Sequence, residues 1–216
     1  MAANIDTVFL MTSLNADLNL RRIERYLATI WESGARPVVL LNKADLCDDT
    51  AASVIAVAEV AFGVSICALS SLTGEGIDQI EEYLKPGQTV ALLGSSGVGK
   101  STLINRLLGR QAQEVREIRE DDARGRHTTT ARRLFLLPAG GMLIDTPGMR
   151  ELQLWDAGDG LARTFEDIER LAQACRFRDC RHDSEPGCAV QSALANQQLG
   201  VGRFESYLKL RRELGY

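Results

Sequence analysis

Long apolar segments are missing from this 216-residue sequence, which contains no run of about 18 or more apolar residues. Because a bilayer-spanning helix needs such a run, we expect no membrane span and no membrane partner. The first residues, 1–6, also lack the basic region and the apolar stretch of a secretory signal peptide. The sequence therefore predicts a cytoplasmic protein.

Lysine and histidine are scarce as well. Four of the 25 basic residues are lysine, and the chain has two histidines. Arginine supplies the remaining positive charge, and its planar guanidinium suits phosphate and RNA. Compositional bias of the genome explains the arginine excess equally well. The net charge of −4 argues against a simple polyanion-binding protein.

The five cysteines are odd in number and unevenly spaced, which does not suit a disulfide framework. Three of them form a C-x4-C-x-H-x5-C pattern, whose members are Cys175, Cys180, His182 and Cys188. Three thiolates and one imidazole suit tetrahedral zinc and leave no open position for substrate, so we predict one structural zinc ion. The alternative is a set of reduced cysteines beside a surface histidine. Cys47 and Cys67 are interpreted as buried thiols.

Six short apolar runs alternate with mostly helical stretches, a pattern typical of a largely parallel sheet. The expected strands are 8–13, 37–42, 64–69, 89–94, 132–137 and 142–145. A helix at 18–31 would link the first two. The last two are separated by only four residues, so we expect them to form an antiparallel hairpin. The fold class is α/β, with a six-stranded, mostly parallel sheet flanked by helices.

The pattern after Gly148 is helical, apart from a Cys/His-rich loop at 175–188, and it ends in an amphipathic helix at 203–214. We therefore predict two domains, 1–154 and 155–216, with a boundary near Trp155. The first would hold the sheet, and the second would be a small helical zinc-binding domain.

A phosphate loop lies between the fourth expected strand and a helical stretch at 102–108. Residues 94–101 read G-S-S-G-V-G-K-S, which matches G-x-x-x-x-G-K-[ST]. Loop amides would surround an anion, Lys100 would reach the β- and γ-phosphates, and the Ser101 hydroxyl would bind Mg²⁺. A chance glycine-rich turn would not need that lysine and that hydroxyl. The predicted residues are Gly94, Ser95, Ser96, Gly97, Val98, Gly99, Lys100, Ser101 and Thr102, and Lys100 is also assigned to catalysis.

Guanine recognition is predicted from N-K-A-D at 42–45. A carboxylate at Asp45 can accept hydrogen bonds from the ring N–H and the exocyclic amine of guanine, and an unpaired site of this kind discriminates against adenine by roughly 10⁴-fold. An N-cap or turn would explain N-K-A-D alone, but a phosphate loop in the same chain favours base binding. A second loop, at 68–76, resembles the GTPase loop whose backbone N–H meets the guanine oxygen. The predicted base-binding residues are Asn42, Lys43, Ala44, Asp45, Ser70 and Ser71.

The γ-phosphate is expected to meet D-T-P-G at 145–148, where Asp145 would hold Mg²⁺ through water and the Gly148 amide would bond the phosphate. The alternative is a strand that runs into a Pro-Gly turn. Upstream, in G-R-H-T-T-T at 125–130, Thr128 would complete the Mg²⁺ shell, and the adjacent Thr129 and Thr130 are the alternatives. Met149 stands where many GTPases carry a water-orienting glutamine, so His127 is the catalytic candidate. Packing or RNA contact is the alternative role of His127.

The order of these motifs is permuted. N-K-A-D comes first and D-T-P-G last, whereas Ras-like GTPases begin with the phosphate loop. A circular permutation preserves the sheet and leads the γ-phosphate-sensing loop directly into the C-terminal segment. With G-R-H-T-T and the cysteine spacing, this order resembles the ribosome small-subunit-dependent GTPase A family, from about Asn4 to the C-terminus.

The resemblance implies a GTPase that acts in late maturation of the small ribosomal subunit and is stimulated by that subunit. Its partners would be GTP or GDP, the subunit and its rRNA, and we expect a monomer. Family members normally begin with an OB-fold barrel, which this sequence is expected to lack. Two alternatives stay open: a non-catalytic GTP-dependent RNA-binding switch, and a P-loop ATPase with a zinc module. An RNA-facing surface or a solvated helix face would use Arg176, Arg178, Arg181, Arg203, Lys209, Arg211 and Arg212.

Overall fold

The computed structural model describes residues 4–15, 17–110, 133–145 and 158–215. The chain divides into two compact units, and neither is continuous in sequence. The first unit comprises 1–19, 35–59 and 63–152, and the second comprises 20–34, 60–62 and 153–216. The predicted boundary near Trp155 lies outside the described residues, so the division 1–154 and 155–216 stays a prediction. No helix in the described ranges is both long and apolar enough to cross a membrane.

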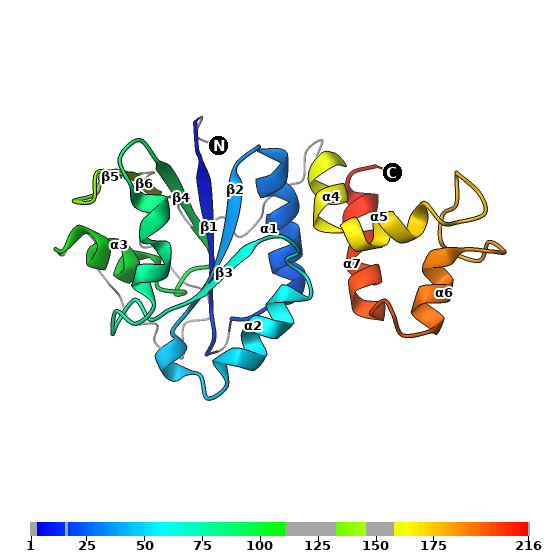
Figure 1. Cartoon of the computed structure of the whole chain (residues 1–216), viewed down its shortest axis with the longest axis horizontal. Helices are drawn as coiled ribbons and strands as arrows, with labels where there is room; N and C mark the ends of the chain where they lie inside the picture. The colour runs from blue at the N-terminus through cyan, green and yellow to red at the C-terminus, as the bar shows by residue number, and fades with distance from the viewer. Residues whose placement is uncertain (1–3, 16, 111–132, 146–157, 216) are drawn as a thin grey trace. The chain divides into compact units, whose positions relative to one another are not determined.

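The first unit is built on a six-stranded sheet in the order β3-β2-β1-β4-β6-β5 (Figure 1). All neighbouring strands are parallel except the β5–β6 pair, which is antiparallel. The mixed sheet and its hairpin are therefore confirmed. The strands are β1 (Thr7–Ser13), β2 (Arg36–Asn42), β3 (Ser65–Ala68), β4 (Thr89–Gly94), β5 (Arg133–Leu136) and β6 (Met142–Asp145).

The central strands are buried along nearly their whole length, as expected for a parallel sheet that is covered on both faces. Phe9, Leu40, Leu92 and Leu143, from four strands, share one apolar core with Leu103. The helical segments of this unit are η1 (Ala44–Leu46), α2 (Thr50–Ala58), η2 (Ile77–Leu84) and α3 (Lys100–Leu108). This core supports the strand ends from which the predicted nucleotide loops emerge.

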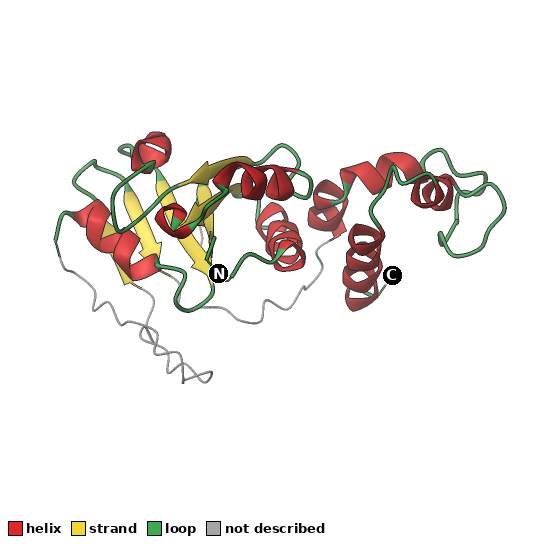
Figure 2. Ribbon diagram, turned by 90° about the horizontal axis from the view of Figure 1, so that it is seen from below, coloured by secondary structure: helices red, strands yellow, loops and turns green. Residues whose placement is uncertain are grey.

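In the second unit, all regular secondary structure within the described residues is helical (Figure 2). The helices are α1 (Leu20–Glu32), α4 (Gly158–Thr164), α5 (Glu166–Ala172), α6 (Ala189–Ala195) and α7 (Val201–Glu213). Helix α1 connects β1 to β2 in sequence but clusters with the C-terminal helices. Its contact with α4 is close, because a Cβ at Gly160 would overlap the Ala28 carbonyl oxygen. Helix α1 thus packs against α4 within the second unit.

A buried arginine joins three of these helices. Arg203 on α7 is 6% exposed and donates two 2.7 Å hydrogen bonds to the Asp167 carboxylate of α5. It also donates to Glu24 Oε1 of α1 at 2.9 Å, and Glu24 is fully buried. Its guanidinium lies 4.7 Å from the centre of the Phe165 ring. Arg203 therefore cannot belong to the basic surface proposed from the sequence, because its charge is buried and paired with the Asp167 and Glu24 carboxylates.

Candidate functional site

The predicted nucleotide loops gather at one edge of the sheet in the first unit. Asn42 ends β2, Gly94 ends β4 and Asp145 ends β6. The register places Asn42 opposite Ser13 of β1, and Gly94 opposite Met11. Since these strands are parallel, their carboxyl ends share an edge, which is where open α/β sheets bind ligands.

The phosphate loop has the predicted strand–loop–helix context, running from the end of β4 to the start of α3 at Lys100. The Lys100 ammonium donates to the carbonyl oxygens of Gly94 and Ser95, each at 2.7 Å. Gly99 has φ +103°, and a Cβ there would collide with the Asn42 amide nitrogen. Only glycine allows this close approach, so the loop is tightly folded before any anion enters.

A partly buried positive charge and a buried negative charge lie beside the phosphate loop. Burial lowers the pKa of Lys100, and the carboxylates of Asp145 and Asp17 oppose that shift. Asp145 is 1% exposed and pairs in register with Leu92 of β4. A buried carboxylate near the N-terminus of α3, where Ser101 carries a hydroxyl, offers the oxygen ligands that Mg²⁺ prefers. The residues present therefore fit a magnesium–phosphate group.

Asn42 joins three loops. Its Nδ2 donates to the Val98 carbonyl of the phosphate loop at 2.7 Å. Its Oδ1 accepts from both the amide and the hydroxyl of Ser71, at 2.9 Å each. The side chain is 2% exposed, so these bonds are formed out of water. Lys43 and Asp45 follow directly, and Asp45 is exposed and accessible to a base.

In the loop at 70–75, one backbone N–H has no hydrogen-bond acceptor among the described residues. The amides of Ser70 and Ser71 donate to the Glu75 carbonyl and to Asn42, both at 2.9 Å. Those of Thr73, Gly74 and Glu75 donate to acceptors within the loop. Among the described residues, the Leu72 amide has no acceptor. Sequence reasoning pointed to Ser70 and Ser71 and missed Leu72, because a backbone N–H leaves no mark on the residue type.

Three predicted residues, His127, Thr128 and Gly148, lie outside the described residues. The remaining nucleotide residues, among them Ala44, Ser96, Gly97 and Thr102, belong to the loops above and the first turn of α3.

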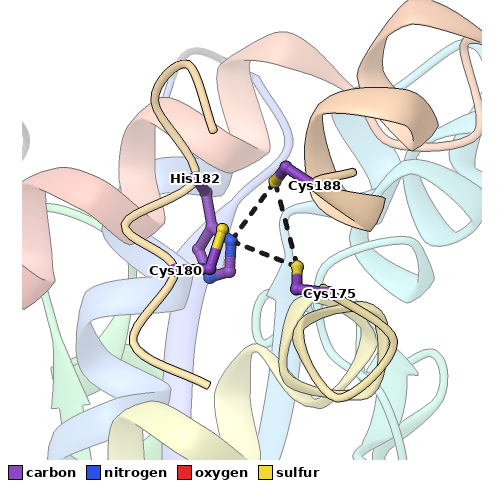
Figure 3. Close-up of side chains that lie close together, drawn as sticks. All are labelled: Cys175, Cys180, His182 and Cys188. Carbon is purple, nitrogen blue, oxygen red and sulfur yellow. Dashed lines mark hydrogen bonds between the residues drawn. The ribbon is translucent and has the colours of Figure 1, made fainter. Parts of the chain in front are cut away.

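The second unit holds the predicted metal cluster. Cys175, Cys180, His182 and Cys188 converge, with their ligand atoms all within 4.8 Å of one another (Figure 3). The Cys175 and Cys188 sulfurs are 3.9 Å apart, and His182 Nδ1 lies 3.6 Å and 3.5 Å from them. Tetrahedral zinc with bonds of about 2.3 Å to sulfur and about 2.0 Å to nitrogen requires separations of about 3.8 Å and 3.5 Å. The donor set therefore fits zinc in both chemistry and spacing.

Neighbouring groups hold the zinc ligands in place. The Ala189 amide donates to the Cys175 sulfur at 3.3 Å, and the Gln191 amide donates to the Cys188 sulfur at 3.4 Å. Such bonds stabilise thiolates. Burial and the charge of Arg211 lower the pKa of His182, which favours the neutral imidazole that binds metal. The remaining cysteines lie in the first unit, where Cys67 is buried and Cys47, contrary to expectation, is half-buried.

Glu185 shapes the rest of this loop. Its carboxylate accepts hydrogen bonds from the amides of Arg181, Asp183 and Ser184 at 2.8–3.2 Å. The bond from the Arg181 amide is the chief reason that the pKa of Glu185 falls to about 2. The segment between α5 and α6 is thus ordered by side chains rather than by regular secondary structure.

Comparison with known proteins agrees with this geometry. A family model described as RsgA GTPase matches residues 1–155. "Small ribosomal subunit biogenesis GTPase RsgA 2" of Lactiplantibacillus plantarum is 55% identical over this whole chain, which covers 61% of that relative. A relative of the same name, RsgA, from Methanosarcina acetivorans is 53% identical and is covered to 58%. The chain therefore spans about three fifths of the length of these relatives.

Solved structures show the same fold. The crystal structure of YjeQ from Thermotoga maritima is 31% identical with a TM-score of 0.72, over 98% of this chain and 72% of that one. YloQ, described as a circularly permuted GTPase, has a TM-score of 0.69 at 24% identity. The permuted GTPase fold predicted from the motif order is confirmed.

Proposed function

This chain belongs to the RsgA GTPase family, and on that premise we propose that it binds GTP with Mg²⁺ and hydrolyses the γ-phosphate. One observation carries the nucleotide assignment. The Asn42 side-chain amide donates to the phosphate loop through its nitrogen, and through its oxygen it accepts from the loop at 70–75, here called the base-side loop. A P-loop ATPase would not need this coupling to N-K-A-D, so the geometry favours guanine over adenine.

In the proposed reaction, water attacks the γ-phosphorus and the bond to the bridging oxygen breaks, which yields GDP and phosphate. Lys100 is already bent over the loop by its bonds to Gly94 and Ser95, and it would exchange these carbonyls for β- and γ-phosphate oxygens. Mg²⁺, held by Ser101, Thr128 and, through water, Asp145, would neutralise developing charge. The Gly148 amide would contact the γ-phosphate, and His127 would orient the attacking water.

On the base side, Asp45 would accept from the ring N–H and the exocyclic amine of guanine, and the Lys43 methylene stem would lie along the ring. The Leu72 amide, the donor without an acceptor in the described part of the loop, would bond the guanine O6. These contacts would distinguish guanine from adenine at the ring N–H, the exocyclic amine and O6.

The proposed biological role is late maturation of the small ribosomal subunit, and the subunit would accelerate hydrolysis. The protein would be cytoplasmic and monomeric. The names of the relatives support the ribosomal role. For rRNA contact, the described zinc loop offers Arg176, Arg178 and Arg181, all exposed, beside Phe177, which is 41% exposed. Guanidinium groups next to an accessible aromatic ring suit phosphate binding and base stacking.

The test is nucleotide turnover by the purified chain with and without small ribosomal subunits, using ATP as the matched substrate. We expect GTP to be hydrolysed slowly alone and faster on the subunit, and ATP to be turned over in neither case. Equal binding of GTP and ATP would refute guanine recognition. Tight GTP binding that no subunit preparation converts to turnover would favour the non-catalytic switch.

A further inference from the structure

Arg106, on α3, holds the base-side loop from outside the predicted motifs. Its Nε donates to the Ser71 carbonyl at 2.7 Å, and its Nη2 donates to the Leu72 carbonyl. One planar guanidinium thus binds two successive peptide groups. The contact is local and tight, because Gly74 has φ +96° and a Cβ there would lie 2.5 Å from Arg106 Nη1. The loop is folded closely around this side chain.

The first of these carbonyls belongs to the same peptide group as the Leu72 amide. No cis peptide bond occurs in the described chain, and in a trans peptide the C=O and N–H point in opposite directions. An arginine that fixes the Ser71 carbonyl toward α3 therefore fixes the Leu72 N–H away from α3. The guanidinium also polarises that peptide, which strengthens the N–H as a donor.

Asn42 restrains the same turn from the other side, through the Ser71 amide and hydroxyl. The peptide between Ser71 and Leu72 is thus flanked by Asn42, which holds the preceding amide, and Arg106, which holds its carbonyl. Without Arg106, the peptide could rotate about its neighbouring φ and ψ angles and lose the direction of its N–H. Asn42 would still keep the loop near the phosphate loop.

We propose that Arg106 is a positioning residue for guanine recognition, which directs the Leu72 amide at the O6 of the base. The inference rests on the proposed GTP function, since it names a residue that sets the specificity of the same site. Arg106 itself would touch no part of the nucleotide.

The test compares three diphosphates by calorimetry. In 6-thio-GDP, sulfur replaces O6 as a weaker acceptor, and IDP lacks only the amine that Asp45 would bind. In Arg106→Ala we expect GDP affinity to fall by about tenfold and the preference for GDP over 6-thio-GDP to shrink by a similar factor. The preference for GDP over IDP should not change. Arg106→Lys should recover part of the loss, because a lysine ammonium can donate to one of the two carbonyls but cannot bind both with the planar geometry of a guanidinium.

Arg110→Ala is the matched control, since Arg110 is exposed just beyond the same helix, and it should bind as the wild type does. A general loosening of the site would lower affinity for all three diphosphates equally, and unchanged ratios in Arg106→Ala would therefore overturn the proposal. So would a wild type that binds GDP and 6-thio-GDP alike. If the wild type prefers GDP to ADP but Arg106→Ala leaves the affinity ratios unchanged, the proposed GTP function stands and the role of Arg106 does not. If the wild type does not prefer GDP to ADP, both the GTP function and the role of Arg106 are overturned.

Discussion

The two units place polar side chains by opposite means. In the first, loops emerge from the ends of parallel strands over a core in which Phe9, Leu40 and Leu92 are fully buried. In the second, segment 173–188 has no regular helix or strand. Its shape comes from four clustered ligand groups and the Glu185 carboxylate. Backbone pairing fixes one site, and side-chain chemistry fixes the other.

This difference has an energetic consequence. Strand pairing and apolar burial are spread over many residues, so no single polar change in the nucleotide loops should unfold the sheet. Metal binding and buried ion pairs depend on a few groups, so the loss of one such group lowers the free energy of unfolding strongly. Polar substitutions in the first unit should therefore change ligand binding, whereas those in the second should change stability.

The largest expected effect is the loss of zinc. We expect metal analysis to find one zinc ion per chain, and Cys180→Ser or chelation to withdraw on the order of 10 kcal/mol of folding free energy from the second unit. Trypsin should then cut after Arg163 and the arginines that follow, before the sheet melts. Cys47→Ser, in the first unit, should keep its zinc. A metal-free chain that stays fully resistant to trypsin beyond Arg163 would contradict the contrast between the units.

The next effect concerns the base and not the fold. Asp45→Asn should lower GDP affinity by roughly 10³-fold, because the carboxylate that accepts two guanine donors is gone. Xanthosine diphosphate should gain affinity, since its extra carbonyl can accept from the new amide. Thermal unfolding should match the wild type. Asp48→Asn, an exposed change in the same loop, is the control for charge alone; similar losses in both variants would show that Asp45 does not read the base.

In the second unit, Arg203→Met should cost about 3–5 kcal/mol, because it leaves the fully buried Glu24 carboxylate without its partner on α7. Nucleotide affinity should change little. Adding Glu24→Gln should recover much of the loss, which a double-mutant cycle of unfolding free energies would measure. Arg212→Ala, exposed on the same helix, should cost less than about 0.5 kcal/mol. Equal losses in Arg203→Met and Arg212→Ala would argue against a buried network.

Catalysis should again separate activity from stability. His127→Ala should lower subunit-stimulated kcat by about 10²-fold with little change in GTP affinity, the usual range for losing a positioned proton-handling group. Single-turnover hydrolysis on the subunit measures it, and His127→Gln, which can still orient water, is the matched variant. If His127→Ala is stimulated as fully as the wild type, the ribosome or another residue positions the water.

Much of the first unit could be predicted, because its signals are local. The motif flanks mark strand ends, and β4 and β6 have the predicted bounds. The five residues between β5 and β6, 137–141, are too few for anything but a hairpin. The cysteine spacing likewise marked the metal cluster, since all four ligands lie within fourteen residues.

The rest depended on contacts between residues distant in sequence. The pattern predicts a helix between the first two strands, but not that this helix packs against α4, more than a hundred residues away. The sequence favours a surface position for Arg203 and indicates no role for Arg106, because residue type does not reveal a buried carboxylate or a pair of peptide carbonyls. The Leu72 donor is backbone, and any residue could supply it.

The smallest expected effect tests a surface pair within the second unit. Arg25 donates two hydrogen bonds to Glu213, at 2.6 Å and 2.8 Å, and these bonds lower the pKa of Glu213. A carboxyl whose pKa is lower in the folded state stabilises the fold above its unfolded pKa of about 4.5 and loses that contribution as the pH falls below it. Both side chains are about one third exposed, so the pair should contribute only about 0.5 kcal/mol at pH 7.

Chemical unfolding of the wild type and of Glu213→Gln measures this contribution. The difference in unfolding free energy between the two proteins should shrink as the pH falls below about 4.5, and it should be smaller at 1 M salt. Acid also protonates the zinc ligands, but it does so in both proteins, so that effect cancels in the difference. Glu205→Gln on the same helix is the control, since Glu205 is exposed and has no ion pair among the described residues. A Glu213 difference as large as that of Arg203→Met would mean that the exposed pair stabilises the packing of α1 and α7 as much as the buried pair does.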